Sequence, residues 1–558
     1  MALECLTDSI GILNNIFEGS CEQAVDCDIT LPDYCSEILR VLKCTAEPCI
    51  VSSKISGDRA CADGNALVRI IYSDENGKIC SYEQEYAFSS HAELGSDMNG
   101  TLFCDAKTEY VNCRAVSRRR IEVHGAVRIS FKICALQSKE LISGVSDPSV
   151  QIKKKCIEFS DIVSCENKQF SLSETVTLPA DYLPAERIIN VSAVPILSQT
   201  KAVNGKILLK GETALSIIYC PSQGEECTVK FDSSVPINQV VDAEGISDEC
   251  IADICLKLMC FECNIKFDEE ESARMFDFSA CINAEIRAYH QKSAEAVTDA
   301  YCVSGDLSAE YEKIKFFNVA EQIEDSFVFK NSLDFSSLES QKICALWFGN
   351  IKIKKGVSGG RLRIEGAVPV YAIVTDSEGK PAFCEREFEF EYSRACPQTD
   401  SDVLFEPRVI MSGYTVGPVS DCKAEVKAEF ILSANVFTVY TESVLVKADV
   451  QEDSKKKCGG SSMVIYFPDD GETVWDIARK YNTTTDLIKE ENRISGDTVT
   501  DCCALKLKPP KFLFFGGISL YKNAKKDCNP HSVTVCELQS FAFIRTLFVL
   551  SSTQRGMN

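Results

Sequence analysis

Four cysteines that lie close together in the chain have the side-chain type and spacing best suited to holding a metal. They are Cys250, Cys255, Cys260 and Cys263, and the last three follow the C-x4-C-x2-C spacing of a plant-type iron–sulfur site. The segment 251–266 around them has a strand-like composition, and side chains alternate between the two faces of a strand. This alternation predicts Cys250 and Cys260 on one face and Cys255 and Cys263 on the other. We therefore interpret the four as small buried thiols, with zinc as the alternative, and expect no metal and no cofactor.

The histidines of this chain are few and do not suggest a catalytic site. There are four histidines, and they do not recur at the spacing of the repeats described below: His91, His124, His290 and His531. Acid–base and nucleophilic mechanisms that depend on histidine therefore lack a constellation. The sequence also has no glycine-rich phosphate loop, dinucleotide fingerprint or zinc-protease signature. These observations predict a protein that is not an enzyme and has no catalytic residues.

The segment 463–510 has the residue order of a small binding module. It opens with an apolar, β-prone run that ends in turn residues, which predicts a strand. Thr473 follows as a helix N-cap, with Asp476 in an approximate capping box. Apolar residues then recur at the spacing of one helical face: Val474, Ile477, Ala478 and Tyr481. A second helix after Thr484 and a strand-like run at 504–507 complete the order strand, helix, helix, strand.

This module resembles a LysM domain over its whole length. The resemblance rests on residues 471–475, on the run 477–481, on Thr483-Thr484 and on Asn492. It implies a small βααβ fold with Trp475, Ile477 and Tyr481 as structural residues. LysM domains hold N-acetylglucosamine-containing glycans between two loops. The resemblance places this groove at Asp470, Gly471, Glu472 and Thr473 on one side and at Ile494, Ser495, Gly496 and Asp497 on the other.

Two departures from the LysM pattern affect the groove more than the fold. Glu491 stands where the family usually has a buried leucine, and residues 501–503, Asp-Cys-Cys, replace a glycine-containing turn. A purely structural alternative also exists for two groove residues, since Gly471 and Gly496 would suit turn geometry alone.

Composition indicates a folded, acidic protein of several domains. The chain has 558 residues, 45% of them hydrophobic and 25% charged, which suits globular domains. A net charge of -23 opposes a nucleic-acid surface, so no nucleic-acid partner is expected. Residues 1–20 lack the pattern of a secretion signal, and no apolar stretch reaches the length of a membrane span. We therefore expect a cytoplasmic protein without membrane insertion, whose 30 cysteines are thiols.

A repeated unit occupies most of the chain ahead of the LysM-like module. Residues 64–72 align without gaps on 211–219, and more loosely on 366–374. Upstream, Leu31-Pro32 matches Leu178-Pro179 at the same offset. A later alternating run also recurs in each unit, at 121–129, 275–282 and 424–432. Self-similarity at a fixed spacing indicates tandem copies of one structural unit.

Period-two alternation and turn residues make each repeat an antiparallel β-unit. Turn signals stand at 74–77 and 376–379, and each unit is long enough to bury its own core. Pro369 inside the third copy of the repeated strand predicts an edge position there. The fold class is mainly β, with three tandem antiparallel β-domains and a small βααβ domain. The expected boundaries are 1–165, 166–305 and 306–450 for the repeats, 451–462 for a flexible linker, 463–510 for the LysM domain and 511–558 for an unassigned tail.

The three units resemble the SPOCS domains of spore-coat assembly proteins from clostridia, most clearly at Leu31, at Leu178 and in the glycine-to-tyrosine strand. Three such units ahead of a C-terminal LysM domain is the layout of a clostridial spore morphogenesis protein. The resemblance implies a non-enzymatic protein that docks coat layers at the forespore surface in the mother cell. It also implies that the LysM domain contacts a morphogenetic ATPase protein. The alternative is a peptidoglycan-binding protein of the spore cortex or cell wall.

The cysteines support one further hypothesis, which concerns cross-linking. If the protein ends in a coat layer that becomes oxidising, exposed thiols at Cys458, Cys502 and Cys503 could link it to neighbouring molecules.

Overall fold

The computed structural model describes residues 4–96, 98–224, 226–267, 272–340, 342–396, 403–451, 463–469, 471–499, 504–508 and 532–534. Asp470, His531, residues 452–462 of the linker predicted at 451–462, and the cysteines Cys458, Cys502 and Cys503 lie outside these residues, as does most of the tail. The described chain is mainly β, as predicted, with two short α-helices in the LysM-like module.

Three consecutive β-units share one strand order. The first consists of β1 (Cys5–Thr30), β2 (Arg40–Ser56), β3 (Arg59–Ser73), β4 (Ile79–Glu93), β5 (Thr101–Ala115) and β6 (Arg120–Val145). The second consists of β7 (Val150–Thr177), β8 (Ala185–Val203), β9 (Lys206–Pro221), β10 (Val229–Asp242), β11 (Ile251–Lys266) and β12 (Met275–Cys302). The third consists of β13 (Asp306–Asp334), the 3-10 turn η1 (Ser336–Leu338), β14 (Lys342–Phe348), β15 (Lys352–Ser358), β16 (Arg361–Thr375), β17 (Pro381–Ala395), β18 (Val403–Val416) and β19 (Lys423–Gln451).

Each unit contains two antiparallel sheets. In the first unit these are β2-β3-β4 and β1-β6-β5, and in the second they are β8-β9-β10 and β7-β12-β11. The third repeats the plan, with β13-β19-β18 in one sheet and β16 between β17 and the pair β14 and β15 in the other. The repeated glycine-to-tyrosine segment is the central strand each time: β3, β9 and β16. Apolar residues that alternate along these strands pack between the two sheets, so each unit has its own core.

Local turn chemistry confirms the predicted hairpins. Asp74 accepts a hydrogen bond from the backbone N–H of Asn76 at 2.9 Å, and Gly77 takes a φ of 75°. In the third unit the Asp376 carboxylate accepts a hydrogen bond from the backbone N–H of Glu378 at 3.0 Å, and Gly379 has a φ of 79°. An aspartate that bonds its own turn, followed by a residue with positive φ, suits these hairpin connections.

Pro369 is not in an edge strand, contrary to the sequence prediction. Its strand β16 is central and pairs with β17 along its whole length. On the other side its partner is interrupted, because β15 pairs with residues up to Ala367 and β14 with residues from Val370 onward. A proline has no N–H for a sheet, and here the gap between two partner strands removes the need for one.

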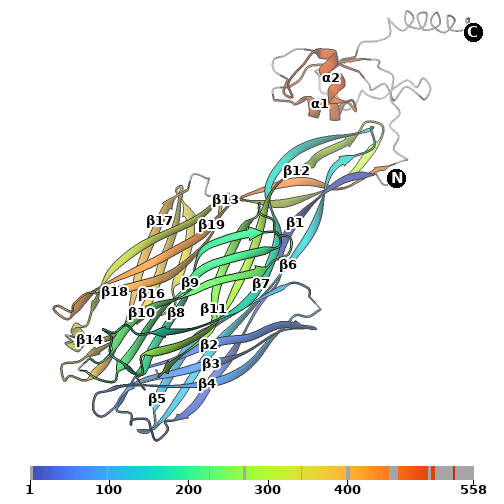
Figure 1. Ribbon diagram of the computed structural model, residues 1–558. Coiled ribbons are helices and arrows are strands. Elements are labelled where there is room, and N and C mark those ends of the chain that lie inside the picture. Colours follow the sequence, from blue (N-terminus) through green and yellow to red (C-terminus); the bar gives the residue numbers. More distant parts are fainter. Residues whose placement is uncertain are drawn as a thin grey trace, which may run out of the picture.

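The three units pack around a common axis as a pseudo-threefold arrangement within one chain. Three isoleucines at equivalent positions meet there, Ile71 of β3, Ile218 of β9 and Ile373 of β16, each almost fully buried. Further along the molecule, the long antiparallel strand pairs β1/β6, β7/β12 and β13/β19 form a stalk with its own apolar core, including Ile10, Ile157 and Ile314 (Figure 1). The units therefore share two cores in addition to their individual ones.

The LysM-like module lies at the far end of this stalk (Figure 1). It consists of β20 (Val464–Tyr466), α1 (Val474–Lys480), α2 (Thr485–Asn492) and β21 (Leu505–Leu507), and β22 (Ser532–Thr534) pairs with β20 on its other side. This is the strand, helix, helix, strand order that the sequence predicts. Within the described ranges, none of the helices has the length and apolarity needed to cross a bilayer.

Candidate functional site

The predicted helix signals of the module are present in the structure. Thr473 caps α1 in a reciprocal capping box with Asp476, and Thr484 caps α2 by accepting from the N–H of Leu487 at 3.3 Å. The predicted apolar face of α1 packs inward, with Val474, Ile477 and Ala478 buried. Such caps satisfy N–H groups that have no partner inside the helix, which fixes where each helix begins.

Two loops of the predicted groove lie side by side. The N–H of Val474 donates to the carbonyl of Asp497 at 2.7 Å, and Thr473 forms a β-bridge with Thr498. Asn492 ties the end of α2 to β21, because its amide accepts from the N–H of Lys506 at 2.7 Å and donates to the carbonyl of Ile488 at 2.8 Å. The structure therefore brings together the two segments that the LysM resemblance selected.

Most side chains of the first loop are engaged within the module. The Glu472 carboxylate accepts from the Tyr466 hydroxyl at 2.7 Å and from the N–H of Asp469 at 3.1 Å, so it braces the loop. Thr473 is occupied by its capping box. Gly471 has a φ of 86°, in the left-handed region that favours glycine. Any ligand contact from Glu472 or Thr473 would therefore come mainly from the backbone.

The second loop of the predicted groove is mostly exposed. Ser495, Gly496 and Asp497 are exposed, while Ile494 is half-buried and packs on the module core. A hydrogen bond from Lys489 holds the pKa of the exposed Asp497 below its ordinary value, so this carboxylate stays charged. Gly496 has no positive φ, and an added Cβ would meet only the carbonyl oxygen of Thr498 at 3.8 Å. The backbone does not require glycine there, and its absent side chain widens the rim.

Glu491, one of the departures from the LysM pattern, is accommodated at the surface. It lies near the end of α2 and pairs with Lys508 at 2.7 Å. The acid therefore stays at the module surface instead of filling the core position that the family usually gives to leucine.

The module is docked on the stalk by residues at the end of β12. The Trp475 indole N–H donates to the Asp299 carboxylate at 2.7 Å, and Arg479 pairs with the same carboxylate at 2.9 Å. The Tyr301 ring lies edge-on to Trp475 with centroids 5.0 Å apart, and its hydroxyl donates to the Thr483 carbonyl at 2.7 Å. Burial raises the pKa of Tyr301, which keeps the hydroxyl protonated as a donor. Tyr301 and its neighbour Val303 belong to the apolar core of the module.

A β-bulge places Asp299 on the side that faces the module. Val297 pairs with Lys154 and Asp299 pairs with Lys153, so Thr298 is an extra residue in the strand. Without it, Val297 and Asp299 would share a face, but the bulge separates them, and Val297 is buried in the stalk. Sequence reasoning missed this docking site. The available signal was Trp475 itself, an aromatic residue outside the apolar face of its own helix.

The four candidate metal-ligating cysteines do not converge. The thiol of Cys260 lies beside Cys49 and Cys281, whereas burial raises the pKa of Cys263 to about 12 in a place near Arg69. Among the described residues, no group of three or more His, Cys, Asp or Glu side chains could hold a metal ion. The predicted alternation of the faces is also wrong. A bulge lies between Leu258 and Cys260 and shifts the register of β11. As a result Cys255 and Cys260 pair with Glu285 and Cys281, which share one face of β12. Cys263 pairs with Phe278, which is on the other face.

The described histidines are separate surface residues. His91 pairs with Glu93 at 3.4 Å, His124 with Asp26 at 3.0 Å and His290 with Glu249 at 3.4 Å. Each pair consists of two side chains that are both more than one-third exposed, and the three pairs lie on different strands. This arrangement does not form a catalytic constellation.

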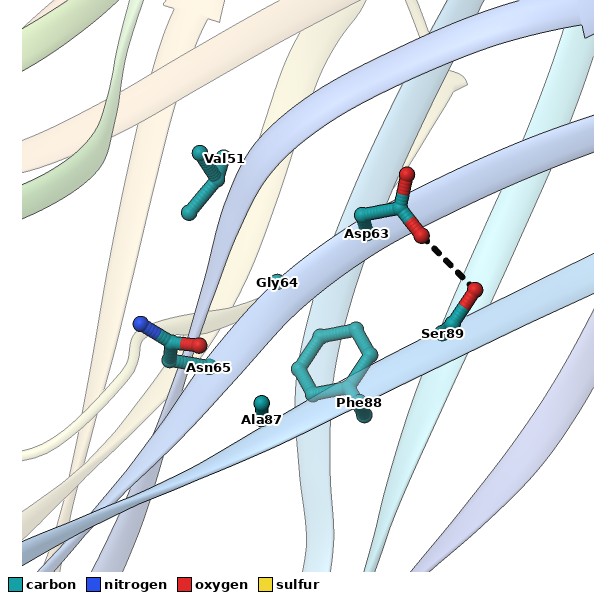
Figure 2. A pocket seen from close by; sticks show the side chains of 7 residues that line it. All are labelled: Val51, Asp63, Gly64, Asn65, Ala87, Phe88 and Ser89. Atoms are coloured by element: carbon teal, nitrogen blue, oxygen red, sulfur yellow. Dashed lines mark hydrogen bonds between the residues drawn. The ribbon is translucent and has the colours of Figure 1, made fainter.

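A shallow hollow on the β2-β3-β4 sheet of the first unit is a consequence of packing. Figure 2 shows Gly64 without a side chain and the Phe88 ring beside it, with Asp63 bonded to Ser89 at 2.7 Å on the neighbouring strand. Phe88 is opposite Gly64 in register, and a Cβ at Gly64 would lie 2.7 Å from the ring. The third unit repeats this with Phe390 opposite its glycine. The hollow is therefore the space left by a recurrent glycine–phenylalanine pair.

Comparison with family models identifies two kinds of domain. The model described as SipL, SPOCS domain matches residues 37–116 and 184–266, which span β2 to β5 and β8 to β11. The LysM domain model matches residues 470–500, which include both groove loops and both helices. No curated protein and no solved structure matches the chain.

Both domain types are binding domains without catalytic activity. A LysM domain of this kind suggests recognition of N-acetylglucosamine-containing glycan, and its combination with SPOCS domains fits a sporulation protein of the spore coat. The repeated β-units, the docked βααβ module and the two family matches together make the chain a SipL-like protein with two SPOCS domains and a C-terminal LysM domain.

Proposed function

We propose that the chain is a non-enzymatic assembly protein that docks coat layers at the forespore surface in the mother cell. The observation that carries this proposal is the presence of two SPOCS domains and a LysM domain in one molecule. We further propose that the third unit is a SPOCS-like domain, because its strand order repeats that of the other two. The three units then act as one rigid scaffold, since they share apolar cores along a common axis.

In this proposal the LysM domain is the contact module, and a morphogenetic ATPase of the coat basement layer is its partner. The resemblance to spore-coat assembly proteins of this layout supports the partner. The structure supports the geometry, because the module lies at the end of the stalk and its loop at 495–497 is exposed (Figure 1). A contact module held in one orientation loses less freedom on binding than one on a flexible tether, which favours assembly.

A second candidate function is binding of peptidoglycan through the same groove. The specific observation in its favour is Gly496, where the backbone allows other residues but the side chain is absent. An open rim of this kind would admit a sugar ring between the loops at 471–473 and 494–497. This function would make the β-units the side of the molecule that faces the coat.

The proposed function can be tested in sporulating cells with a fluorescent fusion of the full chain. Ser495→Trp fills the open side of the groove from an exposed position, so the fluorescent variant should no longer localise at the forespore surface. Glu490→Trp, on an exposed position of α2 outside the predicted groove, is the matched control and should localise normally. Normal localisation of the Ser495 variant, with its LysM domain folded, would contradict the assignment of the groove as the contact site.

A further inference from the structure

Cysteine thiols meet in pairs across the boundaries between units. Cys227, just ahead of β10 in the second unit, lies beside Cys344 of β14 in the third unit. The backbone geometry agrees, because the Thr228 hydroxyl donates to the carbonyl of Cys344. Cys344 is buried in the apolar cluster at the pseudo-threefold axis, and Cys227 packs against that cluster. This pair therefore joins the second and third units.

A second pair lies between the first and second units. Cys49 of β2 lies beside Cys260 of β11, and these two strands pack against each other. Cys260 is also directly opposite Cys281 of β12 in strand register, so three thiols gather at this boundary. Met259, the neighbour of Cys260, packs against the core of the first unit, which places this part of β11 on that unit. All of these cysteines are free thiols in the structure.

The electrostatics of each pair favour reaction of one member. The neighbouring Cys344 thiol holds the pKa of the Cys227 thiol below its ordinary value, and Lys342 acts in the same direction. The neighbouring Cys49 thiol does the same for Cys260. The thiolate is the reactive form of cysteine, so each pair contains one activated sulfur next to a resolving thiol. Cys227 and Cys260 are only partly buried, which gives a small oxidant access.

We propose that Cys227–Cys344 and Cys49–Cys260 are oxidation sites at which peroxide converts thiol pairs into disulfides that join neighbouring units. In each pair the activated thiolate attacks hydrogen peroxide, the O–O bond breaks, and a sulfenic acid forms with release of one water. The partner thiol then attacks that sulfur, an S–S bond forms, and a second water leaves. Two thiols thus lose two electrons and two protons, and one peroxide becomes two waters. This inference does not depend on the proposed function of the LysM domain.

The consequence is a covalent lock on the three-unit scaffold. The units are otherwise connected in the chain only through the segments at the stalk, between β6 and β7 and between β12 and β13. A disulfide closes a long loop in the unfolded chain and so reduces its conformational entropy, which stabilises the folded state. Oxidation would therefore stabilise the folded arrangement of the three units without changing the protein surface.

The test uses the reduced full chain, treated with hydrogen peroxide under native conditions and then alkylated and mapped by mass spectrometry. The expected products are two linked peptide pairs, one with Cys227 and Cys344 and one with Cys49 and Cys260. The melting temperature of the oxidised wild type should rise above that of the reduced form. Cys227→Ser and Cys344→Ser should each remove the first linked pair and that part of the rise. Cys156→Ser, which replaces an exposed thiol, should remove neither.

Different results would overturn the proposal. Recovery of Cys227 and Cys344 as alkylated thiols or as sulfinic acids, in a chain that remains folded, would contradict the first site. A bond between Cys260 and Cys281 in place of Cys49 would show that oxidation stays within the second unit and would contradict the second site. A melting temperature that is unchanged after complete formation of both bonds would refute the lock.

Discussion

Replacing Asp299 with alanine should release the LysM domain from the stalk. Its carboxylate is the common acceptor for the indole N–H of Trp475 and for Arg479, at 2.7 and 2.9 Å. The carboxylate is itself held in place, because it also accepts from the N–H of Ala300 at 2.9 Å and from the Tyr311 hydroxyl at 3.4 Å. Alanine removes the acceptor while leaving the apolar contacts of Tyr301.

The size of the effect follows from the two lost contacts. A hydrogen bond from a neutral donor to a charged group contributes about 1.5–3 kcal/mol. The ion pair with Arg479, whose side chain is 55% exposed, adds about 0–1 kcal/mol because solvent screens it. Since Trp475 is only half-buried, water can partly replace the lost acceptor, so we expect a loss of about 2–3 kcal/mol. This loss corresponds to a shift of about 30- to 140-fold in the docking equilibrium.

Tryptophan fluorescence can measure this shift in the full chain. The protein has two tryptophans, and Trp347 is buried at the pseudo-threefold axis, so it supplies a constant background. Trp475 reports docking, and its emission in the Asp299→Ala variant should move to longer wavelength with stronger quenching by acrylamide. Asp299→Asn keeps an acceptor for the indole and should show a smaller change. Glu295→Ala, which removes an exposed ion pair on the same strand, is the matched control and should resemble wild type.

The prediction has a clear contrary result. If the Asp299→Ala variant keeps the emission and quenching of the wild type, and amide exchange across α1 is also unchanged, the carboxylate does not hold the module. Docking would then rest on the packing of Tyr301 and Val303 and on the hydrogen bond from the Tyr301 hydroxyl to Thr483.

Three further predictions concern the three β-units and the predicted groove of the LysM domain. Ile373→Ala at the pseudo-threefold axis should lower the free energy of unfolding by about 2–5 kcal/mol in urea titrations, whereas the exposed Val328→Ala should change it by less than about 0.5 kcal/mol. Gly211→Ala should lower the melting temperature, because a Cβ there would collide with a backbone carbonyl. Gly496→Ala should leave the melting temperature unchanged. A lower melting temperature for the Gly496 variant than for the Gly211 variant would refute the close packing at Gly211. Burial raises the pKa of Cys220 from 9.0 to about 12, so the folded state keeps a proton there that the unfolded state loses. The contribution of this thiol to the free energy of unfolding is therefore fully present below pH 9.0 and is lost as the pH rises toward about 12. Cys220→Ala should reduce the fall in the free energy of unfolding over this pH range.

Local signals in the sequence were sufficient for the helices and turns. The Thr473 capping box and the aspartate turns at 74–77 and 376–379 depend on residues within a few positions of one another, so their chemistry is visible in the sequence. The LysM resemblance also selected two segments that lie side by side in the structure, and their role as a groove stays a prediction. The structure then changed the roles of Glu472 and Thr473, whose side chains brace the loop and cap the helix.

Features that depend on distant segments were not predictable from the same patterns. Single inserted residues at bulges, such as Thr298, reverse the alternation that sequence reasoning extends along a strand. Pro369 is tolerated in a central strand only because its partner is broken at that point. One signal of the pseudo-threefold axis was present, since the repeated strands lose their alternation at Ile70-Ile71-Tyr72 and Ile217-Ile218-Tyr219. A run of this kind indicates a strand buried on both faces, and the second face is the axis.

The central claim is that the LysM groove binds a protein of the coat basement layer. The most direct measurement is a pull-down with the full chain and with its Ser495→Trp variant, in parallel against sporulating-cell lysate and purified peptidoglycan. The account predicts that the wild type retains a morphogenetic ATPase from the lysate, that the variant loses it, and that neither sediments with peptidoglycan. Saturable binding of the wild type to peptidoglycan, competed by chitin oligomers and without a retained ATPase, would contradict the account and establish a glycan-binding protein.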